Sequence, residues 1–272
     1  MPNVLIVGST RGLGASLANI YASKPETTVY GTTRSPHPPK ATEIQDFDEK
    51  IAWIPHIDVS QEGCGKRLVN SLGMLGGGGG VLKGVIRSFD VVIITAGYFA
   101  TEDFVNGPDW EAEVNMYKTS AISPPFIVHS LFRAKYLAKG AKILIVSSES
   151  GSITLRHEKE GGGNYGHHAS KAATNMVGKL LSLDLKEKGV IVSIVHPGFM
   201  RTGMTEGVGF DKYWDDGGAV YPDEAAKSLV EWVGDLTMEK TGQYWAPRGP
   251  RDIGTADVTM GSDLPTPLQL PW

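Results

Sequence analysis

The chain has 272 residues, of which 41 % are hydrophobic and 21 % are charged, and its net charge is -4 at neutral pH. This composition excludes intrinsic disorder and fibrous repeats. The weak negative charge gives no indication of binding to nucleic acid or to an anionic membrane. Because no apolar run approaches the roughly 20 residues of a membrane span, and the N-terminus shows no secretory signal pattern, we expect a cytoplasmic protein that acts on small molecules.

Short apolar segments alternate along the chain with segments of helical periodicity. The expected strands are residues 4–7, 28–32, 52–57, 91–95, 143–147, 190–195 and 243–246. The expected helices are residues 13–23, 61–72, 110–121, 124–139, 168–188 and 222–236. Most strand segments are continuously rich in Val and Ile, which is typical of strands buried on both faces of a parallel sheet. The alternation predicts one α/β domain over residues 1–272, with a Rossmann-type doubly wound parallel sheet of about seven strands and helices on both faces.

Glycine is the one compositional anomaly, with 34 residues. The glycine runs at 76–80 and 161–163 are interpreted as loop insertions. Residues 198–221 are glycine-studded and aromatic, and we expect a loop there that covers the substrate. The proline-rich tail 249–272 lacks periodicity, so we expect extended chain. The single cysteine, Cys64, excludes an internal disulfide, and no metal site is expected.

The first expected strand leads directly into the pattern Gly8-x-x-x-Gly12-x-Gly14, which opens a helix. Glycines at this place let the backbone approach a pyrophosphate, and the N–H groups at the helix start point at it. A glycine-rich turn without a ligand is the alternative, which the flanking strand and helix make weaker. The cofactor-binding residues expected in this loop are Gly8, Thr10, Arg11, Gly12, Leu13 and Gly14.

No carboxylate follows the second expected strand, where an NAD-binding protein holds the ribose 2′-hydroxyl. The segment reads Thr33-Arg34-Ser35, and Arg11 lies in the glycine loop nearby. Two guanidinium groups without an acid suit a 2′-phosphate, because each binds phosphate oxygens in pairs. The pattern predicts NADP(H) as the cofactor, and solvated surface arginines are the alternative.

Further motifs follow in a fixed order along the chain: Asp58-Val59, Thr95-Ala96-Gly97, Asn115, Ser147-Ser148 before Gly151, Lys171, and Pro197-Gly198 with Met200 and Thr202. With these motifs the chain resembles the short-chain dehydrogenase/reductases over nearly its whole length, and it is most similar to the C-factor and sniffer-like carbonyl reductases. The resemblance implies that Asp58 and Val59 contact the adenine, that Ala96 and Gly97 line the cofactor, and that Lys171 binds the nicotinamide ribose. It also implies a proton relay supported by Asn115 and a substrate carbonyl held by Ser148. The residues that it implies around the nicotinamide are Pro197, Gly198, Met200 and Thr202.

The family's Tyr-x-x-x-Lys motif is altered in this chain. The run Ala169-Ser170-Lys171 fixes the register and places His167 where the family has its tyrosine, which exchanges a proton with the substrate oxygen. Residues four apart share one helix face, and an imidazole has an ordinary pKa of about 6.5, so His167 is the candidate proton donor. The nearby Lys171 ammonium is expected to lower the pKa of His167 and to favour its neutral form. A hydrogen-bonded structural histidine is the alternative. Tyr165 is a candidate only if its segment is not helical, because about 600° of helical rotation would otherwise separate it from Lys171.

These features predict an NADP(H)-dependent oxidoreductase that transfers a hydride between the nicotinamide and a carbonyl or alcohol. The alternative on the same fold is a non-redox enzyme, such as a cyclase or isomerase, or an NADP-binding regulatory protein, because the tyrosine is absent. The charge run 156–160 is interpreted as a solvated face. The helix expected at 168–188 carries an apolar face wide enough to pack on its own domain, and the resemblance implies a homodimer or homotetramer built partly through this region.

Overall fold

A parallel sheet forms the centre of the computed structural model, which describes residues 2–41, 46–77, 86 and 88–272. The sheet has eight strands in the order β3-β2-β1-β4-β5-β6-β7-β8. These strands are β1 (Asn3–Val7), β2 (Thr28–Thr32), β3 (Ala52–Ile54), β4 (Phe89–Ile94), β5 (Leu137–Val146), β6 (Ile191–Val195), β7 (Tyr244–Ala246) and β8 (Leu268–Gln269). Strands β1 to β7 are parallel, and β8 is antiparallel to β7. The doubly wound fold is confirmed, and its strand order reverses between β1 and β4, where such sheets bind ligands at their carboxyl ends.

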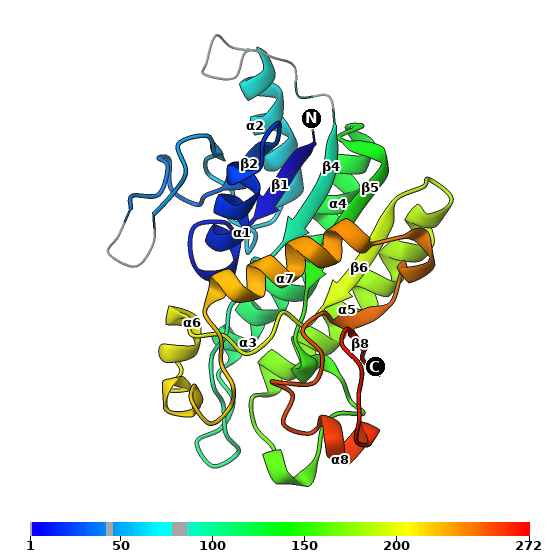
Figure 1. The fold of residues 1–272 in the computed structure, drawn as a ribbon. Coiled ribbons are helices and arrows are strands. Elements are labelled where there is room, and N and C mark those ends of the chain that lie inside the picture. Colours follow the sequence, from blue (N-terminus) through cyan, green and yellow to red (C-terminus); the bar gives the residue numbers. More distant parts are fainter. Residues whose placement is uncertain (1, 42–45, 78–85, 87) are drawn as a thin grey trace.

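Helices cover both faces of the sheet (Figure 1). They are α1 (Gly12–Ser23), α2 (Cys64–Gly77), α3 (Trp110–Tyr117), α4 (Ser123–Arg133), α5 (Tyr165–Lys186), α6 (Gly203–Glu206), α7 (Pro222–Asp235) and α8 (Ala256–Met260). Helices α1 and α7 pack together on one face, whereas α2, α4 and α5 lie on the other. In Figure 1 the carboxyl ends of the strands point toward the lower end of the molecule, where α3, α6 and α8 lie. Within the described part of the chain, no helix is long and apolar enough to cross a membrane.

Alternate side chains of each strand enter two separate apolar clusters. Val4 and Ile6 of β1 pack with residues of α1 and α7, whereas Leu5 and Val7 pack with residues of α2 and α4. All four side chains are fully buried. Burial on both faces explains why these strands are continuously apolar, and it confirms the interpretation of the Val- and Ile-rich segments.

The helix expected over 124–139 ends earlier than its sequence indicates. Lys135 adopts a left-handed conformation with a φ of 61° and closes α4. The Tyr136 N–H then donates to the Leu131 carbonyl at 2.9 Å, as in a Schellman cap. Because glycine usually occupies the left-handed position, a lysine there gives no stop signal in the sequence. The residues released in this way begin β5 at Leu137, so that strand is longer than expected.

Helices α3 and α4 form one continuous rod that contains a wider turn. Residues Lys118–Ile122 are π-helical, and the Ser123 N–H donates to the carbonyl of Lys118, five residues earlier. Pro124 has no N–H, so the carbonyl of Ser120 lacks its usual donor within the helix. Thr174 of α5 donates its hydroxyl to this carbonyl at 2.8 Å. The two expected helices are therefore joined, and the Thr174 hydroxyl of α5 supplies the hydrogen-bond donor that the Ser120 carbonyl lacks at the junction.

The buried face of α5 is small and polar rather than apolar. The residues that face the domain include Ser170, Thr174, Asn175, Gly178 and Ser182. The exposed apolar residues of the helix are Met176, Leu180 and Leu183. The expectation of an apolar packing face is therefore wrong, because α5 approaches β6 too closely for large side chains at the contact.

The tail 249–272 is folded rather than extended. It contains α8, and β8 joins the sheet through the pairing of Leu268 with Ala246. Leu268 and Leu270 are buried in a third apolar cluster together with Tyr244. Both elements are too short to show a periodicity in the sequence, which is why the expectation of an extended tail missed them.

The expected loops are largely present. Residues 198–221 are mostly irregular and contain α6 and a 3₁₀ turn at Asp211–Tyr213. Residues 161–163 form a loop. In the glycine run 76–80, helix α2 extends to Gly77, and the remaining residues lie outside the described part of the chain.

Gly178 marks the closest contact between α5 and β6. A Cβ there would overlap the side chain of Ile194 and lie 2.9 Å from its Cδ1 atom. Gly178→Ala should lower the free energy of unfolding by about 1 to 3 kcal/mol, the usual cost of overpacking, as measured by urea denaturation. The matched control is Gly234→Ala in α7, where a Cβ meets no atom within 4 Å, and stability should stay unchanged or rise by up to about 1 kcal/mol. Equal stability of Gly178→Ala and the parent chain would contradict this packing.

Candidate active site

The glycine loop after β1 packs tightly against the segment that follows β4. Gly8 has a φ of 95°, and a Cβ at this residue would lie 2.7 Å from the Cα atom of Ala96. A Cβ at Gly14 would overlap the carbonyl oxygen of Gly8 and lie 2.8 Å from Thr95 Oγ1. Only glycine fits these two positions, so the loop holds the first turn of α1 at the switch between β1 and β4.

The start of α1 is open toward this crevice. Among the described residues no side chain caps it, including that of the N-cap residue Arg11, and its first turn carries no acid. A Cβ at Gly12 would meet the side chain of Thr202 at 3.5 Å, which is ordinary contact. Thr10 and the buried Leu13 complete the loop. Free N–H groups and the positive end of the helix dipole favour an anion at this point.

Two exposed arginines lie near the ends of β1 and β2. Arg34 follows Thr33, whose hydroxyl accepts the N–H of Ser35 at 3.1 Å and shapes the turn. Neither Arg34 nor Arg11 forms an ion pair with any residue that the structure describes. Both guanidinium groups are therefore available to a phosphate.

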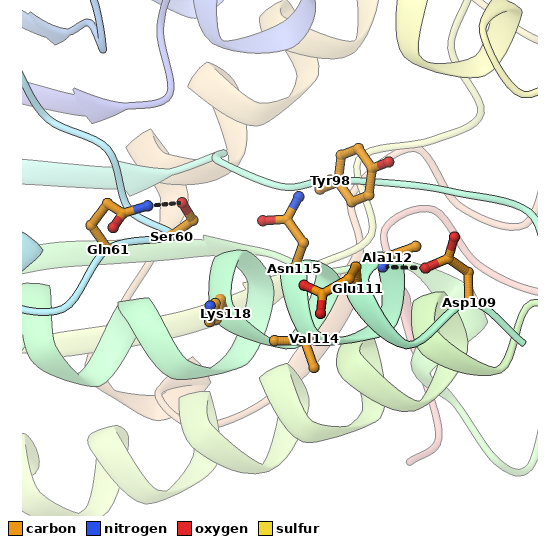
Figure 2. A pocket seen from close by; sticks show the side chains of 9 residues that line it. All are labelled: Ser60, Gln61, Tyr98, Asp109, Glu111, Ala112, Val114, Asn115 and Lys118. Carbon is orange, nitrogen blue, oxygen red and sulfur yellow. Dashed lines mark hydrogen bonds between the residues drawn. The ribbon is translucent and has the colours of Figure 1, made fainter.

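A polar cleft of about 440 Å³ opens beside Asn115 (Figure 2). The amide of Asn115 points toward Tyr98, which follows Gly97, and Ser60 lies at the other end of the cleft. Ser60 donates its N–H to Asp58 at 2.9 Å, so the cleft adjoins the turn that contains Asp58 and Val59. Of the sequence-predicted residues, Asn115 lines this cleft, and Val59 and Gly97 directly precede the lining residues Ser60 and Tyr98.

The segment after β5 lies directly against the backbone of α5, and this contact brings Ser148 and Lys171 to one place. The Ser147 hydroxyl donates to the Lys171 carbonyl at 3.3 Å. A Cβ at Gly151 would lie 2.6 Å from the carbonyl carbon of Lys171, so no larger residue fits there. The hydroxyl oxygen of Ser148 accepts the Ser150 N–H at 3.2 Å, which holds its orientation.

The Lys171 ammonium is buried at the carboxyl edge of the sheet. Its Nζ atom donates to the Val146 carbonyl at 3.1 Å and lies 3.9 Å from the position of a Cβ on Gly97. The Ser120 hydroxyl lies 4.0 Å from that position and has no hydrogen-bond partner among the described residues. Burial disfavours the charged form and lowers the pKa of Lys171 to about 8. The ammonium is therefore charged at neutral pH, and it loses its proton within the pH range of an activity assay.

His167 lies one helical turn before Lys171, on the same face of α5. Its ring packs against Phe99 with the centroids 4.2 Å apart and the planes tilted by 34°, and its Nδ1 atom is enclosed without a partner among the described residues. Burial, followed by the charges of Lys171, His168 and Arg156, holds the pKa of His167 well below its ordinary value. The imidazole is therefore neutral at neutral pH, in the direction expected from the neighbouring Lys171, and burial is the larger cause.

Tyr165 is the first residue of α5 and lies inside the helix. The Gly166 N–H donates to the carboxylate of Glu102 at 2.8 Å, and this cap from the loop after β4 starts the helix before residue 168. Tyr165 is therefore on another face of the helix than Lys171. A catalytic role for Tyr165 required a non-helical segment, and this requirement is not met.

The segment after β6 closes the site from the opposite side. Pro197 is followed by Gly198, which has a φ of 106°. Met200 forms a bridge with the end of the 198–221 loop, and Thr202 caps α6 with its hydroxyl. Because Thr202 also lies beside Gly12, the segments that follow β1 and β6 meet at this point.

Sequence reasoning missed several side chains that shape the site. Residues 158–160 of the charge run are exposed as expected, but Arg156 also binds Glu149 and, at 3.1 Å, Glu160. The Tyr244 hydroxyl donates to the carbonyl of Ser148. Phe99 and Glu102 belong to the same group of missed residues. Most of these contacts join residues that are far apart in the sequence, so no local pattern marks them.

The chain matches known proteins over most of its length. The sequence model of the family described as short chain dehydrogenase matches residues 2–212. The chain belongs to the short chain dehydrogenase family. This confirms the family resemblance inferred from the motifs.

Individual relatives are distant but nearly complete. A 1-hydroxy-2-glutathionyl-2-methyl-3-butene dehydrogenase of Rhodococcus sp. (strain AD45) is 26 % identical over 247 residues, which cover 90 % of this chain and 96 % of the relative. The NADPH-bound carbonyl reductase from chicken fatty liver has a TM-score of 0.71 at 20 % identity and covers 90 % of this dehydrogenase and 96 % of its own chain. The carbonyl reductase Sniffer of D. melanogaster has a TM-score of 0.70 at 18 % identity, with 100 % of both chains covered. At these identities, the two solved structures show the shared fold.

Proposed function

We propose that this short-chain dehydrogenase is an NADP(H)-dependent oxidoreductase that interconverts a carbonyl compound and its alcohol. The observation that carries the proposal is the meeting of four chain segments at the carboxyl edge of the sheet. These are the glycine loop, the segment at Gly97, the Ser148 segment packed on Lys171, and the segment that ends at Thr202. One crevice therefore combines a phosphate cradle with a hydroxyl and an ammonium.

The cradle fits NADP(H) by its own chemistry. The tight glycine contacts and the uncapped start of α1 suit a pyrophosphate. The free guanidinium groups of Arg11 and Arg34 suit a 2′-phosphate. The structure of the chicken carbonyl reductase has NADPH bound, which supports the same cofactor for this chain.

Reduction requires a proton at the carbonyl oxygen and a hydride at the carbonyl carbon, and NADPH supplies the hydride when it is bound. Ser148 is placed to hold the oxygen through its hydroxyl. His167 has no imidazolium proton to give at neutral pH, and its enclosed Nδ1 atom has no partner from which to take a replacement. We therefore assign the proton to the Lys171 ammonium, which passes it through Ser148 or a water molecule. Asn115 lines the cleft beside this path.

One observation favours the non-redox alternative on the same fold. The position of the family's tyrosine holds a neutral imidazole that cannot readily donate a proton. A cyclase, an isomerase or an NADP-binding regulatory protein would need no donor at this position. The intact Ser148 and Lys171 constellation favours the redox function.

Turnover of carbonyl compounds tests the proposed function directly. Purified protein with NADPH and a panel of aldehydes and ketones should oxidise the cofactor, as followed by the loss of its near-ultraviolet absorbance. If the protein binds NADPH, as detected by its fluorescence, but neither reduces any carbonyl compound nor oxidises the corresponding alcohol, the non-redox alternative is the better account.

The preference for NADP(H) depends on the two free arginines. Arg34→Ala should weaken NADPH binding by roughly 1.5 to 3 kcal/mol, the range for charged hydrogen bonds, and barely change NADH binding. Arg133→Ala, at the exposed end of α4, is the control and should change neither affinity. Equal losses for NADPH and NADH in Arg34→Ala would exclude a contact with the 2′-phosphate.

The pH profile identifies the proton donor. Because the Lys171 ammonium is populated below its pKa of about 8, kcat for reduction should be level near pH 7 and fall about tenfold per unit above pH 8. His167→Phe should keep kcat within about tenfold and preserve this break, whereas Lys171→Met should lose about 10² to 10⁴ in kcat. Tyr165→Phe should leave kcat unchanged. A loss of about 10² or more in His167→Phe would return the role to His167.

We also propose a homodimer or homotetramer in the cytoplasm. Exposed apolar residues on the rod formed by α3 and α4, and on α5, would be covered by a second copy. These residues are Ile122, Phe126, Met176, Leu180 and Leu183. Light scattering at micromolar concentration should give at least twice the monomer mass, and Phe126→Glu together with Leu180→Glu should shift it toward the monomer.

A further inference from the structure

A buried polar chain lies behind the Ser148 segment. Its members are His196, which ends the segment from β6, and Asp252 and Arg248 from the C-terminal part of the chain. None of these side chains belongs to the expected cofactor or catalytic residues. They link the two segments that hold Ser148 and Gly198.

His196 supports the Ser148 segment directly. Its Nδ1 atom accepts the Glu149 N–H at 3.0 Å, one residue after Ser148. Since Nδ1 acts as an acceptor, the neutral ring carries its proton on Nε2. That nitrogen lies 3.9 Å from Asp252 Oδ1, so the carboxylate favours this tautomer by its charge although the distance is too long for a hydrogen bond.

Asp252 supports the segment after β6. Its side chain is 0 % exposed, and its Oδ2 atom accepts the Phe199 N–H at 2.8 Å. A Cβ on Gly198 would lie 2.5 Å from the same oxygen, so only glycine lets the backbone reach the carboxylate. Asp252 therefore fixes the backbone at Gly198 and Phe199, within the Pro197–Thr202 segment.

The charge of Asp252 is balanced within the protein. Arg248 Nε lies 3.6 Å from Asp252 Oδ2, and the same guanidinium binds Glu224 of α7 at 2.8 Å. A buried carboxylate is costly unless it is paired and hydrogen-bonded. Here it is paired by Arg248 and bonded by Phe199, while Oδ1 has no hydrogen-bond partner among the described residues and faces His196.

We propose that His196 and Asp252 are positioning residues by which the C-terminal tail sets the Ser148 segment and the Pro197–Thr202 segment relative to each other. This inference rests on the proposed function for its effect on turnover, but not for its effect on the two segments. The tail also reaches the Ser148 side at a second point, where Thr154 donates its N–H to the Trp272 carbonyl at 3.1 Å. The tail thus completes the site rather than merely covering the sheet edge.

Substitutions at His196 separate positioning from bulk packing. In His196→Asn the amide oxygen can replace Nδ1 as acceptor for the Glu149 N–H, whereas His196→Leu fills the space without an acceptor. Asp252→Asn removes the charge and places an N–H donor toward either Arg248 or the Nε2–H of His196. The matched control is Asp257→Asn, the same exchange at an exposed residue of the tail.

Hydrogen–deuterium exchange of the full chain, with and without NADPH, measures the positioning without any turnover. We expect faster exchange in residues 148–156 and 197–202 for His196→Leu and Asp252→Asn, and parent-like exchange for His196→Asn and Asp257→Asn. In carbonyl reduction, His196→Leu should lower kcat by about 10- to 100-fold, the cost of a misplaced group, with little change in KM. His196→Asn should retain most of kcat.

Unchanged exchange in both segments for Asp252→Asn and His196→Leu would overturn the inference. A loss of kcat in His196→Asn as large as in His196→Leu would also overturn it, because the acceptor would then not be what matters. If His196→Leu does not fold, the exchange of Asp252→Asn against Asp257→Asn decides the question. A parent chain that reduces no carbonyl refutes the proposed function but leaves the exchange result valid.

Discussion

The ammonium of Lys171 lies where the segment after β5, the π-helical turn and the loop after β4 meet. Removing a charge from water is costly unless hydrogen bonds replace the lost solvation, and one N–H group of Lys171 has the Val146 carbonyl as its acceptor. The small residues on the buried face of α5 allow the helix to approach the sheet closely enough for this arrangement. The geometry of Ser148 follows, because its segment is seated on the backbone of Lys171.

Burial first, and then the same charge, lowers the pKa of the side chain at position 167. A tyrosine beside a cation keeps its phenolic proton at neutral pH and can donate it, whereas an imidazole beside a cation remains neutral. To donate directly, a neutral imidazole would have to become an imidazolate, which is strongly unfavourable. In the proposed mechanism the transferable proton therefore belongs to Lys171 rather than to position 167, and Phe99 packs against the ring of His167.

Features encoded by neighbouring residues were accessible from the sequence. The glycine loop, the alternating strands and helices, and the register set by Ala169-Ser170-Lys171 all depend on local spacing, and the fold and family expected from them are confirmed. The end of α4 at a left-handed lysine was not accessible, since only glycine is a reliable signal there. The early start of α5 depends on Glu102, which is distant in the sequence. The lowering of the His167 pKa by Lys171 was expected from their spacing, whereas the larger effect of burial depends on the tertiary structure.

The central claim is that the imidazole at position 167 is neutral while the neighbouring lysine carries the proton. Long-range nitrogen–proton correlation spectra of the protein with labelled histidine report the protonation state of each of its 7 imidazoles, and His167→Asn assigns the relevant signal. The signal of His167 should show a neutral ring at pH 7 and remain so as the pH is lowered through the ordinary imidazole range. Lys171→Met should raise the pKa of His167, because a repelling charge is removed. An imidazolium spectrum for His167 at pH 7 would contradict the assignment of the proton to Lys171.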